Sequence, residues 1–323
     1  MANVPAQKLK LPQGFFETGY QVIKIARPVH WVKNLALFAA LIFSGNLFSP
    51  THQLIVFLAF LSFNFAASAT YIFNDINDAA QDRLHPIKKN RPIASGKLPV
   101  PIALFLMVIL ILTSVYIAVA LNPLFLLSLI AYLSLQALYS LGLKNMAIVD
   151  ILIIASGFIL RVYSGAFVID AHLSVWFLLC VISTALFLAS GKRRAELGIS
   201  PKGTTRKSLS KYKRQLLNSY VTMFGNAAWL SWALFTFFES PTPVTPVWIF
   251  LAEISRTTTI SKLLMITIPI VIFGIMRYEA LIFENRSEAP EKLLLTDKAL
   301  VASVALWTGL IVWILYGGIT SFT

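Results

Sequence analysis

Three aspartates and two asparagines fall within nine residues in the segment NDINDAAQD, residues 74–82. On a continuous helix Asn74, Asp78 and Asp82 are spaced by four residues, and Asp75 lies three residues before Asp78, so all four share one face. Like charges at this spacing repel, and nothing within the segment offsets them. A divalent cation would offset them, and Mg²⁺ prefers oxygen ligands together with substrate phosphates. The spacing predicts an Mg²⁺ site whose metal ligands, and catalytic residues, are Asp75, Asp78 and Asp82.

Basic side chains follow the acidic segment directly: Arg83, Lys88, Lys89, Arg91 and Lys97. Cations beside a metal ion commonly hold a diphosphate. The plainer interpretation is a solvated, acidic helix end. That interpretation would suffice for one aspartate, but three on one face after an apolar run favour metal binding. Asn74, Arg83 and Arg91 are therefore candidates for substrate binding.

The composition places these residues in a membrane protein. The chain of 323 residues is 57% hydrophobic and 13% charged, with a mean hydropathy of +0.75. Soluble domains carry about 25% charged residues. Because residues 1–33 are polar and basic and have no cleavable apolar core, we expect that they do not form a signal peptide. The one cysteine, Cys180, lies in an apolar run, so the sequence offers neither a disulfide framework nor a cysteine metal site.

Apolar runs long enough to cross a bilayer recur along the chain. We expect an all-α integral membrane protein of one domain (1–323), with a cytoplasmic N-terminal segment (1–33) and a bundle (34–318) of nine transmembrane helices enclosing a cavity. The expected spans are 34–49, 53–73, 100–121, 123–141, 148–169, 174–191, 215–238, 258–283 and 299–318. The acidic segment then lies at the end of the second span, and we expect that helix to continue through 71–83.

The distribution of charge predicts the orientation. Of the 27 lysines and arginines, 24 lie in segments that the nine spans place on one side. The positive-inside rule puts these segments, the N-terminus and the candidate site in the cytoplasm, and the C-terminus outside the cell membrane. Most of the +13 net charge is therefore explained by topology, and nucleic acid is excluded as a partner.

One cation lies within a predicted span. Arg161 sits between Gly157 and Gly165, where a charge must face a cavity, the protein interior or a partner. A helix-packing pair with Asp150 or Asp170 is the plainer alternative, but both lie too far along a straight helix. We expect Arg161 to line the cavity and to contact a phosphate.

Several segments together resemble a known family. NDINDAAQD matches the NDxxDxxxD motif of the UbiA-type prenyltransferase superfamily, and the resemblance covers nearly the whole chain. A finer similarity, to the polyprenyl-phosphate (decaprenyl-phosphate) phosphoribosyltransferase branch, is found in ARPVHWVKN (26–34), NDINDAAQDRLHPIKKNRPIASG (74–96), YSLGLKN (139–145), GFILRVYSGAF (157–167), GKRRAEL (191–197) and RYEALIF…APEKLLLTD (277–297).

The resemblance implies a fold and an activity. Members of the superfamily are nine-helix membrane enzymes whose aspartates bind a diphosphate through Mg²⁺. The branch implies transfer of 5-phosphoribose from phosphoribosyl diphosphate to a polyprenyl phosphate, giving a lipid-linked sugar phosphate for cell-wall or related glycan assembly. It also raises Lys33 and Arg27, and Tyr139 with Lys144, to substrate-binding candidates. Their residue types alone would suggest only interfacial or topogenic side chains.

One departure from the wider superfamily supports the branch. Aromatic prenyltransferases usually carry a second motif, DxxxD, after the sixth span. Here that loop (191–214) has nine basic residues and one acid, Glu196. Phosphoribosyl diphosphate and a lipid phosphate carry more anionic groups than a prenyl diphosphate, and a cationic loop suits them. We expect Lys192 and Arg193 to face the site, although a Lys192–Glu196 pair on a continuing helix is an alternative.

Two other functions remain open from the sequence. An aromatic prenyltransferase for a quinone-type lipid would share the first motif and the metal, and the missing DxxxD counts against it. A transporter or flippase of an anionic lipid would place polar residues near the membrane midplane. Here only Arg161 is deep, which favours an enzyme at the membrane surface. Oligomeric state, lipid chain length and the choice between Mg²⁺ and Mn²⁺ stay open.

Overall fold

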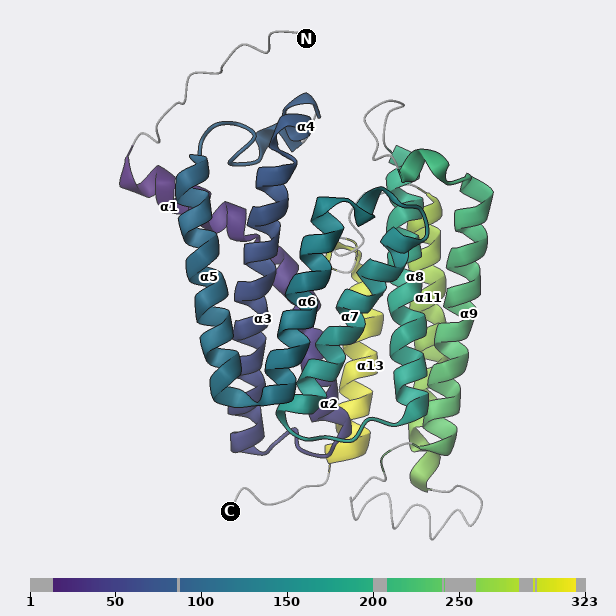
Figure 1. Cartoon of the computed structure of the whole chain (residues 1–323). Helices are drawn as coiled ribbons and strands as arrows, with labels where there is room; N and C mark the ends of the chain where they lie inside the picture. The colour runs from purple at the N-terminus through teal and green to yellow at the C-terminus, as the bar shows by residue number, and fades with distance from the viewer. Residues whose placement is uncertain are drawn as a thin grey trace.

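A computed structural model describes residues 14–85, 88–199, 208–239, 241, 260–284, 293 and 295–317. The described residues form helices and no strand, and Figure 1 shows the long helices standing side by side. Their bounds are α1 Phe15–Ala26, η1 Pro28–Leu37, α2 Phe38–Phe43, α3 Pro50–Asn77, α4 Ala79–Leu84, η2 Lys88–Asn90, α5 Val100–Leu121, α6 Pro123–Leu141, η3 Leu143–Asn145, α7 Val149–Val168, α8 Val175–Ile199, η4 Leu209–Lys211, α9 Arg214–Phe238, η5 Ile260–Thr267, α11 Ile268–Phe283 and α13 Lys298–Tyr316.

Helix boundaries follow local sequence signals. Prolines stand in the first turn of α3, α5, α6 and α11, where the missing amide proton costs nothing. Asn122 caps α6 by accepting from the amides of Leu124 and Phe125. Asp297 caps α13 by accepting from the Leu300 amide, and it also binds Arg277 at 2.6 Å. These signals keep the apolar runs separate, so each forms its own helix.

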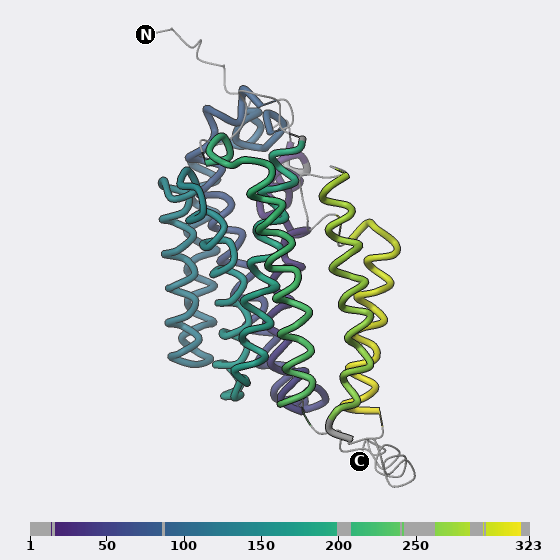
Figure 2. The backbone as a smooth tube through the Cα atoms, turned by 90° about the vertical axis from the view of Figure 1, so that its right-hand side faces the viewer, coloured from purple at the N-terminus to yellow at the C-terminus, as the bar shows by residue number. Residues whose placement is uncertain are grey.

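Eight helical stretches in the described residues are long and apolar enough to cross a membrane. They correspond to the second through ninth predicted spans, and the chain is an integral membrane protein. Large apolar side chains on α5, such as Phe105 and Leu112, are exposed, as expected of a helix that faces lipid. Figure 2 shows α11 and α13 standing together as a pair beside the rest of the bundle.

The first predicted span, 34–49, is not confirmed as a continuous transmembrane helix. This part of the chain is a 3-10 helix, η1, followed by the short helix α2. η1 packs closely against α7, since a Cβ added at Gly165 would lie 2.0 Å from the Leu37 carbonyl oxygen. From Pro28 to Phe43 the two helices rise roughly 29 Å by standard geometry, close to the thickness of the hydrocarbon layer, so the apolar run resembled a span.

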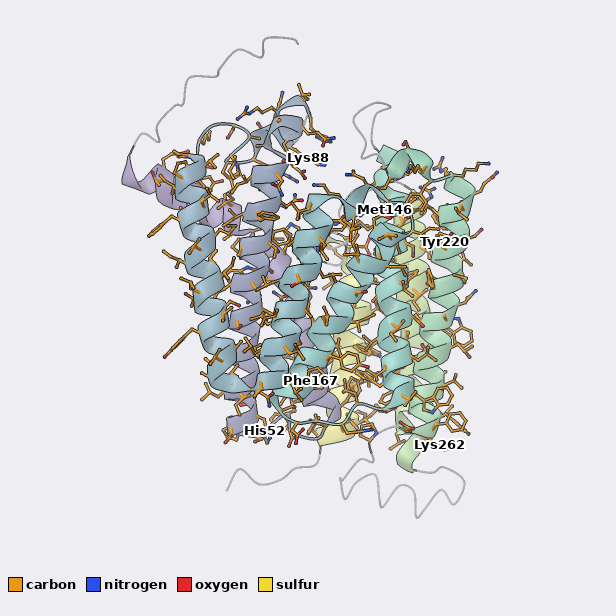
Figure 3. The ribbon with its side chains drawn as sticks, in the orientation of Figure 1. His52, Lys88, Met146, Phe167, Tyr220 and Lys262 are labelled. Carbon is orange, nitrogen blue, oxygen red and sulfur yellow. The ribbon has the colours of Figure 1, made fainter. Side chains whose placement is uncertain are left out.

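The two ends of the bundle differ in what they hold. The acidic motif, α1, α4 and the short helices η2, η3 and η4 lie at one end, while the last turn of α13 lies at the other (Figure 1). Lys88 and Met146 mark the first end, and His52 and Lys262 mark the second (Figure 3). The fold therefore gathers the N-terminal end of α7 and the C-terminal ends of α3, α6 and α8 around one candidate site.

Candidate active site

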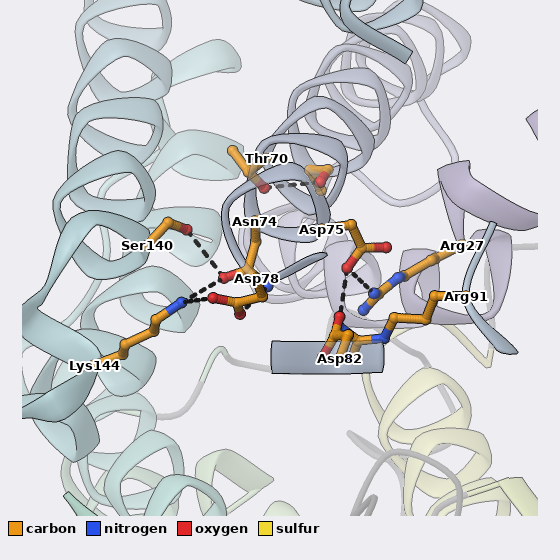
Figure 4. Close-up of polar contacts among 10 residues, drawn as sticks. Arg27, Thr70, Asn74, Asp75, Asp78, Asp82, Arg91, Ser140 and Lys144 are labelled. Carbon is orange, nitrogen blue, oxygen red and sulfur yellow. Dashed lines mark hydrogen bonds and ion pairs between the residues drawn. The ribbon is translucent and has the colours of Figure 1, made fainter. Parts of the chain in front are cut away.

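The acidic motif does not lie on one continuous helix. Helix α3 ends at Asn77, Asp78 has φ −91° and ψ 0°, and α4 begins at Ala79. The break turns α4 away from the axis of α3. The expected stack on one helix face is confirmed for Asn74 and Asp78, whose side chains meet at 3.0 Å, and is wrong for Asp82, which lies beyond the break. Instead the motif divides into two pairs of side chains, shown in Figure 4.

The first pair is Asp75 with Asp82, joined by arginines. Asp75 Oδ1 accepts from Arg27 at 2.5 Å and from Arg91 at 3.0 Å, and Arg91 also donates to Asp82 Oδ2 at 2.6 Å. The Asp75 and Asp82 side chains are 2% and 5% exposed. Burial raises the pKa of Asp82, and Arg91 acts in the opposite direction. Two guanidinium groups thus neutralise two buried carboxylates.

The second pair is Asn74 with Asp78, which meet Lys144 of η3. The Lys144 ammonium group lies 2.5 Å from Asp78 Oδ1 and 3.3 Å from Asn74 Oδ1. Asn74 in turn donates to Asp78 Oδ2 at 3.0 Å, and the Ser140 hydroxyl of α6 reaches Asn74 at 3.4 Å. The sequence motif YSLGLKN therefore contacts NDINDAAQD, as the choice of Lys144 anticipated. Ser140 was not anticipated, since a serine near a helix end gives no signal of its own.

The donor set fits a hard divalent cation. Within the described part of the chain, no three acidic, histidine or cysteine side chains stand close enough together to form a ready metal site. The buried Asp75 Oδ2 atom, however, has no hydrogen-bond partner. Buried carboxylate oxygens seldom lack one, and an ion bound at this oxygen would satisfy it. Carboxylate and amide oxygens are also the ligands that Mg²⁺ prefers.

Arg193 lies in a separate buried cluster at the ends of α6, α7 and α8. Its Nε is 2.6 Å from Asp150 Oδ2, an ion pair without an aligned hydrogen bond. It also donates to Glu196 at 2.5 Å and to the Tyr139 hydroxyl at 2.7 Å. Glu196 thus pairs with Arg193, where the sequence had offered a Lys192–Glu196 pair as an alternative. Arg193 and Tyr139 therefore contact each other in this cluster, and the carboxylates that Arg193 binds are Asp150 and Glu196.

Tyr212, which follows η4, completes that cluster. Its hydroxyl donates to Asp150 Oδ1 at 2.7 Å and accepts from the Ile148 amide at 2.5 Å. Burial and the neighbouring Asp150 raise the pKa of Tyr212 above its ordinary value, so the hydroxyl stays protonated. Asp150 is noticeable in the sequence because an acidic residue opens an apolar run. Its ion-pair partner Arg193, 43 residues away, could not be predicted from spacing.

A cavity of about 400 Å³ runs between η1, α2, α7, α8, α9, α11 and α13, and its walls are almost wholly apolar. On α8, Thr184 and Leu188 line it. Lys192 follows Leu188 by four residues, so it continues the lining face toward the end of the bundle that holds the site. Among described residues, Lys192 has no hydrogen bond or ion pair, whereas Arg193 and Arg194 both have partners.

Lys33 of η1 extends a second wall of the cavity in the same way. On a 3-10 helix residues three apart lie on one side, and Ala36 and Ala39 line the cavity. Lys33, one turn before Ala36, therefore extends that lining. Arg83 of α4 is exposed, and its Nε donates to the Ala94 carbonyl at 3.3 Å. Of the cations considered from the sequence, Arg27, Arg91 and Lys144 contact the aspartates of the motif directly.

Arg161 is buried and does not line the cavity. Its guanidinium donates to Asn34 Oδ1 at 2.5 Å, to the Gly157 carbonyl at 2.5 Å and to the Tyr132 hydroxyl at 2.9 Å. Asn34, wholly buried, then donates to Asn64 of α3 at 2.6 Å. The prediction that Arg161 lines the cavity is therefore wrong: its guanidinium binds residues of η1 and α6 inside the protein.

Comparisons with known proteins agree with this geometry. The UbiA prenyltransferase family matches residues 35–193. A decaprenyl-phosphate phosphoribosyltransferase from Corynebacterium glutamicum is 35% identical over 301 residues, which cover 91% of this chain and 86% of that protein. The chain belongs to the UbiA prenyltransferase family. A Mycolicibacterium smegmatis protein with the same name is 33% identical over 90% of this chain and 91% of its own length. The similarity to both enzymes places the chain in the phosphoribosyltransferase branch.

Solved structures share the fold. A UbiA homologue from Archaeoglobus fulgidus bound to GPP and Mg²⁺ superposes with a TM-score of 0.67 at 18% identity, covering 91% of this chain and 98% of that one. A structure described as digeranylgeranylglyceryl phosphate synthase gives 0.59 at 17% identity, covering 93% of this chain and 99% of that one. At such identities the likeness concerns the arrangement of helices alone.

Proposed function

We propose that this UbiA-family chain is a membrane-bound phosphoribosyltransferase. It transfers the 5-phosphoribosyl group of phosphoribosyl diphosphate to a polyprenyl phosphate of the decaprenyl type. The observation that carries the proposal is the match along nearly the whole chain to enzymes named for that transfer, at 35% and 33% identity. The product would be a lipid-linked sugar phosphate, suited to cell-wall or related glycan assembly.

The donor subsite is the cluster around the aspartates. Asp75, Asp78 and Asp82, with Asn74, would hold Mg²⁺, which when bound neutralises charge on the departing diphosphate. Arg91 and Lys144 already lie among these side chains, at 2.6 Å and 2.5 Å from carboxylate oxygens. Guanidinium and ammonium groups in this position bind phosphate oxygens and stabilise the charge that develops there.

The acceptor subsite is the apolar cavity and its mouth. A cavity of about 400 Å³ suits a ligand of drug size, so it would take only the part of a polyprenyl chain nearest the phosphate. The rest of the tail would lie in the bilayer. Lys192 and Lys33 extend two walls of the cavity toward the aspartates, and we assign them to the lipid phosphate. The membrane then supplies much of the positioning of the acceptor.

The reaction needs no protein base. An oxygen of the ionised lipid phosphate attacks C1 of the ribose as the C1–O bond to the diphosphate breaks. The diphosphate leaves with the bonding electrons, and positive charge builds on the ribose ring in the transition state. The side chains of Arg91 and Lys144 bind the donor and hold its diphosphate in line, which is where most of the rate enhancement would arise.

The orientation of the chain in the membrane is part of the proposal. The charge asymmetry puts the acidic motif, α1 and η4 in the cytoplasm, where phosphoribosyl diphosphate is a soluble metabolite. The end of α13 lies at the other end of the bundle and would face outward (Figure 1). Labelling of single introduced cysteines in a Cys180→Ser background, with a membrane-impermeant reagent, tests this orientation.

An assay with purified enzyme in detergent tests the function. Ribose-labelled phosphoribosyl diphosphate, Mg²⁺ and polyprenyl phosphate should give label in the lipid phase and free diphosphate in equal amounts. Asp78→Asn should abolish transfer. Asp170→Asn, the same change at an exposed aspartate beyond the far end of α7, should leave it intact. Prenylation of 4-hydroxybenzoate from a prenyl diphosphate would instead support an aromatic prenyltransferase, and no turnover with either pair would favour a transporter.

A further inference from the structure

Arg27 joins α1 to η1 in an unusual backbone conformation. Its φ and ψ are 53° and 59°, the left-handed region that residues other than glycine and asparagine rarely adopt. Its guanidinium donates to Asp75 Oδ1 at 2.5 Å and lies 5.0 Å from the centre of the Tyr71 ring. A strained joint that presents a cation to a buried carboxylate is a feature typical of a functional site.

The arginines lie between the carboxylates and solvent. The Asp75 side chain is 2% exposed, whereas those of Arg27 and Arg91 are 20% and 23% exposed. A divalent cation that approaches Asp75 from water therefore meets a guanidinium group first. A divalent cation bound at the unpartnered Oδ2 of Asp75 would lie beside the two guanidinium groups on Oδ1, so repulsion between like charges makes the cation and the arginines compete for this carboxylate.

The two arginines are not equivalent. Arg91 bridges Asp75 and Asp82, so it retains one carboxylate partner if it releases the other. Arg27 binds only Asp75 among the described carboxylates, and it lies at the left-handed joint between α1 and η1. Arginine is also the side chain best shaped for bidentate binding of phosphate. Arg27 is therefore the residue free to exchange one anion for another.

We propose that Arg27 is a placeholder cation and a donor-binding residue. In the ligand-free enzyme it neutralises Asp75. When Asp75 ligates a divalent cation, Arg27 leaves it and binds the diphosphate of the donor. The identity of that donor rests on the proposed function, whereas the competition between Arg27 and the divalent cation for Asp75 does not.

Mn²⁺ binding to the ligand-free protein tests the exchange. The Arg27→Asn variant removes the cation and keeps a residue that tolerates left-handed backbone. Removal of a competing cation should tighten Mn²⁺ binding about tenfold, measured by electron paramagnetic resonance, because a charged hydrogen bond no longer has to be broken. In the same variant, binding of phosphoribosyl diphosphate in the presence of Mn²⁺ should weaken about tenfold, because one charged contact to the diphosphate is lost.

Lys24→Asn is the matched control, since it removes the same charge from the exposed last turn of α1 and should change neither affinity. Arg27→Lys should restore part of the donor affinity, and size-exclusion profiles check that each variant is folded. Mn²⁺ binding to folded Arg27→Asn that is unchanged or weaker overturns the proposal. Arg27→Asn could bind Mn²⁺ more tightly and phosphoribosyl diphosphate more weakly while the wild type transfers no label to the lipid. That combination would refute the proposed function alone and uphold the exchange.

Discussion

The buried pair of Asp150 and Arg193 tests whether Arg193 serves structure or substrate. Both residues are 0% exposed, and their charged atoms lie 2.6 Å apart. Replacing Asp150 with asparagine leaves a buried guanidinium with Glu196 as its one remaining carboxylate partner. Breaking a buried ion pair by removing one partner costs about 3–5 kcal/mol. Because Glu196 stays at 2.5 Å, we expect the lower end of that range.

Chemical unfolding in mixed detergent micelles measures this loss. The Arg193→Met and Asp150→Leu changes should each destabilise strongly when made alone. Together they should cost less than the sum, because neither buried charge is then left without its partner. A coupling of about 1–3 kcal/mol is expected for side chains in direct contact. The folded fraction of Asp150→Asn should retain the wild-type KM for phosphoribosyl diphosphate.

The refuting result is equally definite. If Asp150→Asn unfolded like the wild type but raised the KM for phosphoribosyl diphosphate, then Arg193 would contact substrate and not the protein. That outcome would restore the role that the basic loop suggested for Arg193. It would also mean that the cluster of Asp150, Glu196 and Tyr139 opens when the donor binds.

Three further predictions concern the packing and the two subsites. Gly165→Ala should reduce the yield of folded protein, because its Cβ would lie 2.0 Å from a backbone oxygen of η1. Gly309→Ala is the control: its Cβ would meet no atom within 4 Å, so it should be neutral or stabilise the protein by up to about 1 kcal/mol. Thermal unfolding compares the two variants. Lys144→Met should lower kcat by about 10²–10³-fold in the labelled-ribose assay without loss of folded protein. Lys192→Gln should raise the KM for polyprenyl phosphate and leave that for the donor unchanged.

The sequence was sufficient to predict the membrane architecture and the acidic motif. Hydropathy located eight of the nine predicted spans, since each is a separate apolar run of adequate length. It failed at 34–49, because composition does not distinguish a 3-10 helix from an α-helix. The close approach of η1 to α7 depends on Gly165, a residue more than a hundred positions away, where a Cβ would collide with the Leu37 carbonyl oxygen.

The candidate site was predicted less completely, for a similar reason. Helical spacing suggested that Asn74, Asp78 and Asp82 stack on one face, and it could not foresee that the helix breaks at Asp78. Lys144 and Arg91 were identified correctly as neighbours of the aspartates, although their roles stay predictions. Counting the basic residues of segment 191–214 exaggerated the free positive charge there, since Asp150 and Glu196 neutralise Arg193.

The balance of charge at the site explains why metal and donor should bind together. Three aspartates face three cations in ion-pair contact, so the ligand-free cluster has no net charge, and each carboxylate already has a partner. A divalent cation alone meets three cations already paired with these carboxylates, and any cation that it displaces is left uncompensated in a largely buried site. A donor that binds without metal must compete with the carboxylates for the same cations. When both arrive, the carboxylates pass to the metal and the cations pass to the phosphates, so every charge keeps a partner. A neutral cluster of this kind selects the metal–diphosphate complex over either component.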